Sequence, residues 1–215
     1  MSGSRVLILD YKMSNLRSAA KALERLGASV TVTDAPVSLD RVDAVVLPGV
    51  GAFGEAMRRI REQGLDRTIG DAVERDVPVL GICLGLQLLF DESEESPGVA
   101  GLGVLPGAVR RLTTTRKLPQ IGWNTVDWRR DTPFAPPADA GTLDRAYYFV
   151  HSFSVHPERE GHVLGVCDHG GEFVAAAGDR HVAGVQFHPE KSSRAGLALL
   201  DRWLTLVGER EGVGV

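Results

Sequence analysis

Residues 77–90 read VPVLGICLGLQLLF, in which an apolar run passes through a glycine-flanked cysteine into a second apolar run. Residues 77–82 have the branched, apolar composition of a buried parallel strand, and residues 84–90 predict a helix. Cys83 stands at the junction. A strand that ends in Gly-x-Cys-x-Gly before a helix is typical of a nucleophile elbow, because the tight turn leaves little room for a Cβ on either side of the nucleophile. The stretch therefore predicts an α/β fold with Cys83 at the carboxyl end of a strand.

The rest of the first half alternates strands and helices in the same way. Strands are predicted at residues 5–10, 29–33 and 44–47. One helix is predicted to follow Ser14, and another helical region covers residues 52–75 with a break near its central glycine. Such alternation predicts a mostly parallel central sheet with helices on both faces.

The second half has a different pattern. Strands are predicted at residues 125–128, 146–154, 162–167, 173–177 and 182–187, with few helices between them. We therefore expect antiparallel additions to the same sheet, followed by a closing amphipathic helix over residues 192–207.

Length and composition favour one domain over residues 1–215. The chain is 43% hydrophobic and contains no Pro/Gly/Ser-rich linker. We expect a core of about residues 5–207 and a frayed tail at 208–215. The net charge of −4 favours neither nucleic acid nor an anionic membrane surface, and no apolar run approaches the roughly 20 residues that span a bilayer. Two cysteines make no disulfide framework and no signal sequence is evident, so we expect a cytoplasmic protein.

Cys83 has the local surroundings of a catalytic nucleophile. The start of the following helix favours a thiolate there, and the backbone amide of Leu84 is placed to donate to a developing oxyanion. Most free cysteines are simply small buried residues, and this is our interpretation of Cys167, which lies in an apolar strand.

His188 has the best local context for a base among the six histidines. It follows a predicted strand, and Glu190, two residues later, could accept a hydrogen bond from the imidazole and select its tautomer. Pro189 between them restricts the backbone. His-Pro-Glu is also common in surface turns, so the assignment depends on His188 meeting Cys83 in the fold. No histidine pair has metal-ligand spacing, so we expect no metal and no cofactor.

Two motifs together, GICLGLQ at 81–87 and QFHPEKS at 186–192, resemble those of the class I glutamine amidotransferases. The resemblance implies that Cys83 attacks the side-chain amide of glutamine. It also implies that His188 protonates the leaving ammonia, that Glu190 orients His188, and that water then hydrolyses the thioester.

Further motifs are similar to one branch of this family, the glutaminase subunits of imidazole glycerol phosphate synthase. They are DY at 10–11, NLRS at 15–18, PGVGAF at 48–53, GWN at 122–124 and YFVHSF at 148–153, and the similarity extends over about residues 5–207. It implies a heterodimer with a (β/α)8-barrel cyclase. That cyclase uses the ammonia to make imidazole glycerol phosphate and aminoimidazole carboxamide ribotide in histidine biosynthesis.

The same resemblance assigns supporting residues. Oxyanion donors would come from Gly49, Val50, Gly51 and Leu84. Glutamine would be bound by Gln87, Glu95, Ser152 and Phe153, and the cyclase would contact Asn15, Trp123, Tyr148 and Lys191. Without the resemblance, Gln87 would be an exposed helix residue and the acidic run at 91–95 a solvated helix end.

The opening loop departs from the family. Lys12 and Ser14 stand where glycines are usual, so we expect either that these positions need no positive φ or that the loop is shifted. We also hypothesise that residues 49–51 are held in an unproductive orientation until a partner binds, because glutamine hydrolysis without an acceptor wastes ammonia. Three other functions stay open at this point: another class I glutaminase (serving aminodeoxychorismate, guanylate or vitamin B6 synthesis), a stand-alone cysteine amidohydrolase, and a non-catalytic interaction module.

Overall fold

Five parallel strands form the centre of the computed structural model, which describes residues 3–13, 16–129, 132 and 134–211. They lie in the order β2 (Ser29–Thr33), β1 (Arg5–Leu9), β3 (Ala44–Gly49), β4 (Val79–Cys83) and β13 (Val182–Val185). Every residue of β3, β4 and β13 is buried. Strands covered on both faces must be apolar throughout, which is why these segments are continuous apolar runs.

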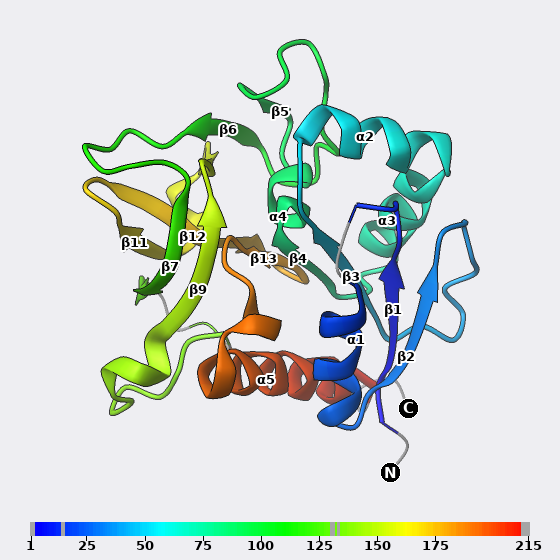
Figure 1. Ribbon diagram of the computed structural model, residues 1–215. Helices are drawn as coiled ribbons and strands as arrows, with labels where there is room; N and C mark the ends of the chain where they lie inside the picture. The colour runs from blue at the N-terminus through cyan, green and yellow to red at the C-terminus, as the bar shows by residue number, and fades with distance from the viewer. Residues whose placement is uncertain (1–2, 14–15, 130–131, 133, 212–215) are drawn as a thin grey trace.

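Helices cover both faces of this sheet (Figure 1). They are α1 (Leu16–Arg25) and α5 (Ser193–Glu211) on one face, and α2 (Phe53–Glu62), α3 (Leu65–Glu74) and the short α4 (Leu84–Leu88) on the other. The alternation of side chains along β1 produces this division, since Val6 and Ile8 pack with α1 and α5, whereas Leu7 and Leu9 pack with α2 and α3. No described helix is both long and apolar enough to cross a membrane.

Antiparallel strands extend the sheet beyond β13. The path continues through β12 (Glu172–Asp179), β10 (Phe153–Pro157), β6 (Gly107–Arg111) and β5 (Glu92–Ser93), and β11 (Val163–Asp168) with β8 (Asp127–Trp128) branches from β12. A separate antiparallel ribbon contains β7 (Gln120–Thr125) and β9 (Ala146–His151). Three 3-10 helices complete the fold: η1 (Thr142–Arg145), η2 (Glu160–His162) and η3 (Pro189–Lys191).

The predicted fold class is confirmed, with a mostly parallel sheet, helices on both faces and antiparallel additions. Two strands of the second half differ from the expectation. β13 is parallel to β4 rather than antiparallel, and β9 pairs with β7 outside the main sheet. The strand predicted over 146–154 is interrupted at Ser152, whose carbonyl accepts a hydrogen bond from Leu112 N at 2.9 Å, so the chain passes there from one sheet to the other.

Helix ends differ as well. α4 stops at Leu88 because the carbonyls of residues 88–90 accept hydrogen bonds from the chain at 102–105 instead of continuing the helix. The acidic run at 91–95 is therefore not a helix end; it contains β5. α5 continues through Glu211, so residues 208–211 are helical, and the rest of the expected tail lies outside the described residues.

Gly85 provides a stability test of the contact between α4 and β3. A Cβ at this position would lie 1.7 Å from Leu47 O, so Gly85→Ala is expected to lower the free energy of unfolding by about 1–3 kcal/mol through overpacking. Gly70→Ala is the matched control, because a Cβ in that α3 position meets no atom within 4 Å, and it should raise the free energy of unfolding by roughly 0.5–1 kcal/mol. Urea denaturation measures both. Equal effects of the two substitutions would contradict the close approach.

Candidate active site

The turn between β4 and α4 holds Cys83 in a strained conformation. Its backbone has φ 56° and ψ −111°, in a region that residues with a side chain seldom adopt. A Cβ on Gly81 would lie 2.7 Å from Leu86 N, which explains the glycine on the strand side of the turn. α4 begins at the next residue, Leu84, so the first free amides of a helix lie beside the thiol.

β13 brings His188 to this turn. Its parallel register places Val185 opposite Ile82, so the chain that leaves β13 passes alongside Cys83. Gln186 is fully buried there, and its Nε2 lies 3.7 Å from the Cys83 sulfur. The two expected catalytic residues are therefore brought together by neighbouring strand ends, although they are far apart in sequence.

Glu190 holds the ring of His188. Its Oε1 lies 2.8 Å from Nδ1 of the imidazole, and both side chains are buried. Ser192 fixes the turn around them, since its hydroxyl donates to the carbonyl of His188 at 2.6 Å and accepts a bond from the amide of Tyr148 at 2.9 Å. Glu190 therefore fixes the ring of His188, and Ser192 ties the backbone of His188 to β9.

The electrostatics favour a protonated imidazole. Burial lowers the pKa of His188, but interaction with Cys83 and Glu190 outweighs this effect and raises the pKa to about 9. Its Nε2 makes no hydrogen bond to any described residue, so this nitrogen is free to transfer a proton. The other buried histidine beside the site behaves in the opposite way, because burial lowers the pKa of His151 to about 4. His151 bonds to Phe153 O and Gln120 Oε1, at 2.8 and 3.1 Å.

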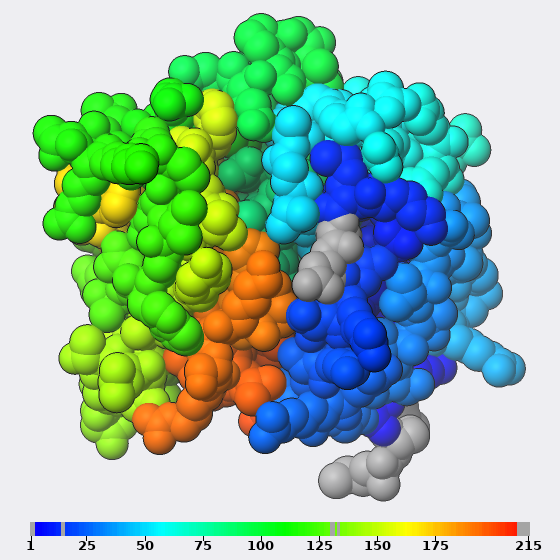
Figure 2. Space-filling model, viewed as in Figure 1, coloured from blue at the N-terminus to red at the C-terminus, as the bar shows by residue number. Residues whose placement is uncertain are grey.

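A cavity of about 360 Å³ opens above Cys83. Eight of the expected site residues line it: Val50, Gly51, Cys83, Leu84, Gln87, Glu95, Ser152 and Phe153. Pro119, Val150 and His151 complete the wall and were not predicted from the sequence. Figure 2 shows the corresponding hollow between the yellow-green atoms of β9 and the cyan atoms that lead into α2, with green atoms of α4 at its floor.

Gln87 and Glu95 differ from what composition alone indicates. Gln87 is buried rather than exposed, and its Nε2 donates to Gln186 Oε1 at 3.0 Å and to Phe153 O at 3.1 Å. Glu95 is half-buried, and its Oε2 accepts a hydrogen bond from Phe53 N at 2.8 Å, at the start of α2. The acidic run therefore contributes a carboxylate to the cavity wall.

The segment 49–51 is attached to the opening loop. The amide of Val50 donates to Met13 O at 3.0 Å, so this N–H is engaged outside the cavity. Gly51 has φ 102°, a conformation that favours glycine. In the conformation described, Val50 therefore supplies no hydrogen-bond donor above the Cys83 sulfur.

Of the two alternatives expected for the opening loop, the one without positive φ is wrong at Lys12, which has φ 63°. Local bonds stabilise this conformation. The backbone amide of Lys12 donates to the Asp10 carboxylate at 2.8 Å. Its Nζ forms ion pairs with Asp10 at 3.0 Å and with Asp34 at 2.8 Å. The carbonyl of Lys12 accepts a hydrogen bond from Arg59. A lysine thus replaces the usual glycine by forming its own ion pairs. Ser14 lies outside the described residues.

The expected interface residues lie on the β7–β9 ribbon and the turn at η3. Trp123 is 56% exposed and packs edge-on against Tyr148 at a centroid separation of 6.2 Å. Ile121, in the same strand, is 64% exposed, and Lys191 is exposed. Asn15 lies outside the described residues. These side chains form an apolar patch with a basic neighbour, here called the ribbon patch (Ile121, Trp123, Tyr148 and Lys191).

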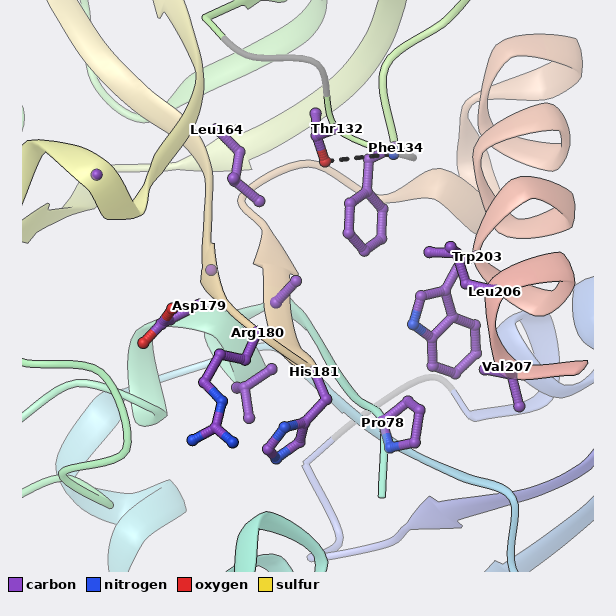
Figure 3. A pocket seen from close by; sticks show the side chains of 14 residues that line it. Pro78, Thr132, Phe134, Leu164, Asp179, Arg180, His181, Trp203, Leu206 and Val207 are labelled. Atoms are coloured by element: carbon purple, nitrogen blue, oxygen red, sulfur yellow. Dashed lines mark hydrogen bonds between the residues drawn. The ribbon is translucent and has the colours of Figure 1, made fainter. Parts of the chain in front are cut away.

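A second cavity of about 360 Å³ lies at the other end of the sheet (Figure 3). Pro78 and His181, which precede β4 and β13, line it together with Phe134 and Trp203. It is therefore separated from Cys83 by the length of the strands. Within the described ranges, no group of three His, Cys, Asp or Glu side chains is placed to hold a metal ion.

Comparison with known proteins identifies the relatives of the chain. Residues 7–205 match the family model described as glutamine amidotransferase class-I. The chain is 46% identical to imidazole glycerol phosphate synthase subunit HisH of Moorella thermoacetica, covering 97% of this chain and 98% of that protein. It is 40% identical to the HisH subunit of Bacillus subtilis, and the match covers 95% of this chain and 97% of that protein.

Solved structures share the fold. PurLQS from Thermotoga maritima superposes with a TM-score of 0.76 at 23% identity, covering 95% of this chain and 99% of that one. A crystal structure of a glutamine amidotransferase gives a TM-score of 0.73 at 23% identity. The match covers 94% of this chain and 98% of that one.

The imidazole provides a pH test of this site. Because the folded-state pKa of about 9 exceeds the ordinary value of 6.5, protonated His188 stabilises the fold fully below pH 6.5, and this contribution is lost as the pH rises through 9. NMR titration of His188 should therefore give a midpoint near 9. Glu190→Gln should lower that midpoint and cost on the order of 2 kcal/mol of stability below pH 6.5, with little cost above pH 9.

The exposed Glu158→Gln is the control for that titration, and it should change neither the midpoint nor the stability. A His188 midpoint that Glu190→Gln leaves in place would show that the carboxylate does not hold the imidazolium.

Proposed function

The chain belongs to the class-I glutamine amidotransferase family, and from this premise we propose that it is the glutaminase subunit of imidazole glycerol phosphate synthase in histidine biosynthesis. It hydrolyses glutamine to glutamate and supplies the ammonia to a partner subunit. The observation that carries the proposal is the placement of Cys83 at a strained elbow beside His188, which is itself bonded to Glu190 at 2.8 Å. The 40–46% identity to HisH subunits over nearly the whole chain favours this pathway over those of other class-I glutaminases.

The reaction follows from the geometry. The proton of Cys83 is held at Nε2 of His188, in keeping with the raised pKa of the imidazole, and the sulfur attacks the side-chain amide carbon of glutamine. The carbonyl oxygen becomes an oxyanion, and when the C–N bond breaks His188 protonates the nitrogen, which leaves as ammonia. Water then attacks the thioester, gives its proton to His188 and releases glutamate, which restores the thiol. Glu190 keeps Nδ1 bonded throughout, so the proton transfers occur at Nε2.

Glutamine is bound by the cavity wall. Glu95 has Oε2 on the amide at the start of α2, which leaves Oε1 for the substrate's ammonium group. Ser152 and Phe153 line the opposite wall and offer backbone groups. Gln87 already donates to the carbonyl of Phe153, so it contributes by holding that wall and through its own Oε1.

The described conformation is a resting state. Leu84 offers one oxyanion donor from the start of α4, but Val50 N–H is bound to Met13 O. We propose that Gly49, Val50 and Gly51 reorient when the partner and its ligand bind, and that an amide of this segment then reaches the oxyanion. A missing donor of this kind costs on the order of 10²–10³ in rate. This resting state also disfavours a hydrolase that works alone.

The partner is a (β/α)8-barrel cyclase that forms a heterodimer with this chain. The ribbon patch supports this part of the proposal, because exposed aromatic and aliphatic side chains without a cover are typical of protein interfaces. Asn15, from the opening loop, is assigned to the same contact. Ammonia can then pass to the acceptor without reaching solvent. We place the complex in the cytoplasm, where a reducing environment keeps Cys83 as a free thiol.

Glutamate release tests the function directly. The isolated chain should turn over glutamine at least about 100-fold more slowly than its complex with the barrel cyclase and a ligand of the cyclase site. Cys83→Ala should abolish the stimulated activity. Cys167→Ala is the control, since this second buried cysteine lies in β11, and it should stay active. Full-speed hydrolysis by the isolated chain would contradict the resting state, and no hydrolysis in any mixture would contradict the glutaminase.

Trp123→Ala tests the interface. Removing the indole from the ribbon patch should weaken binding of the cyclase by roughly 30-fold, which corresponds to about 2 kcal/mol. Val32→Ala changes an exposed side chain on the edge strand β2 and serves as the control, with no expected effect on the dissociation constant. Calorimetric titration measures both. Equal affinities for Trp123→Ala and the unmodified chain would place the interface elsewhere.

A further inference from the structure

Tyr11 has a buried hydroxyl that none of the activity described so far uses. Its side chain is fully buried, and Oη makes no hydrogen bond to a described residue. Buried hydroxyl groups nearly always have a partner, so an unpaired one indicates either strain or a partner that arrives in another conformation. Tyr11 belongs to the opening loop, two residues before Met13, whose carbonyl holds the Val50 amide.

The hydroxyl lies against the segment expected to move. A Cβ built on Gly49 would lie 1.8 Å from Tyr11 Oη and 3.0 Å from Leu84 Cβ. The phenol therefore occupies the space that a side chain at position 49 would need, between β3 and the elbow. Position 49 must be glycine for the hydroxyl to approach the backbone this closely.

Peptide geometry identifies the missing partner. In a planar trans peptide, the N–H and the C=O point in opposite directions. A rotation of the Gly49–Val50 peptide that turns Val50 N–H from Met13 O toward the cavity must turn Gly49 C=O toward the opening loop. The acceptor then turns toward the loop that carries Tyr11, whose hydroxyl already lies against Gly49.

We propose that Tyr11 is a positioning residue whose hydroxyl donates to the carbonyl oxygen of Gly49 and so stabilises the competent orientation of residues 49–51. The inference rests on the proposed function and names a residue that controls its site. In the resting state the Val50–Met13 bond is formed and the hydroxyl is unpaired; in the competent state that bond is exchanged for one from Tyr11. The opening loop thus has a hydrogen-bonding group for each orientation.

The chemistry of the phenol suits this role. Burial, together with the nearby Cys83 and Asp10, raises the pKa of Tyr11 above its usual range, so the group keeps its proton and remains a donor. A carbonyl oxygen needs a donor, and the tyrosine hydroxyl can supply one without moving far because it already touches Gly49.

Tyr11→Phe in the complex with the cyclase and its ligand is the test. Loss of one buried hydrogen bond in the competent state should lower the stimulated kcat about 5- to 20-fold and leave the KM for glutamine unchanged. The melting temperature should not fall, because the resting state loses only an unpaired polar group. Tyr147→Phe removes the hydroxyl of the other fully buried tyrosine, beside Trp128, and should keep the unmodified kcat and KM.

The amide signal of Val50 in an isotopically labelled chain provides a readout that does not depend on turnover. In the ligand-bound complex it should shift away from its position in the isolated chain, and Tyr11→Phe should return it part of the way. An unchanged stimulated kcat in Tyr11→Phe, or a fall matched by a lower melting temperature and a higher KM, would overturn the inference. Absence of glutamine hydrolysis by the unmodified complex would instead overturn the proposed function.

Discussion

The parallel pairing of β13 with β4 is the interaction on which the site depends. Its register runs from Val182 opposite Val79 to Val185 opposite Ile82, so both strands end at the same edge of the sheet. Cys83 completes one strand and His188 follows the other, and their side chains meet without any long excursion of the chain. An antiparallel β13 would carry His188 to the opposite edge, beside the second cavity. The apolar contacts along both strands therefore hold the site together as much as the polar contacts at their ends do.

The first half of the fold, the elbow at Cys83 and the contact between His188 and Glu190 could be predicted because their signals are local. The elbow at Cys83 needs only a strand, two glycines and a helix in sequence order, and the pairing of His188 with Glu190 is a contact between residues two apart. The direction of β13 could not be predicted, since a short apolar strand fits either orientation and its neighbours decide between them. The burial of Gln87 depends on Gln186, a partner far along the chain, and was missed for the same reason.

Energetically unfavourable features gather around residues 49–51. Cys83 and Lys12 both have positive φ values, and the hydroxyl of Tyr11 has no partner among the described residues. Residues 49–51 lie near these positions, and the amide of Val50 joins them to the opening loop through its hydrogen bond to Met13 O. Penalties of this kind reduce the free-energy difference between the described conformation and the reoriented one that we propose, so binding of a partner can supply it.

Ser192 has a consequence for how such a protein can change over generations. Its hydroxyl joins the amide of Tyr148, in the ribbon patch, to the carbonyl of His188, through bonds of 2.9 and 2.6 Å. The ribbon patch and the turn that carries His188 are therefore joined through one side chain. Under the proposed function, a mutation that tilts the ribbon to suit a diverging partner also displaces the imidazole, so natural selection acts on recognition and catalysis together. The two subunits are bound to co-evolve along paths that preserve the ribbon's backbone, with variation confined to the side chains that project from it.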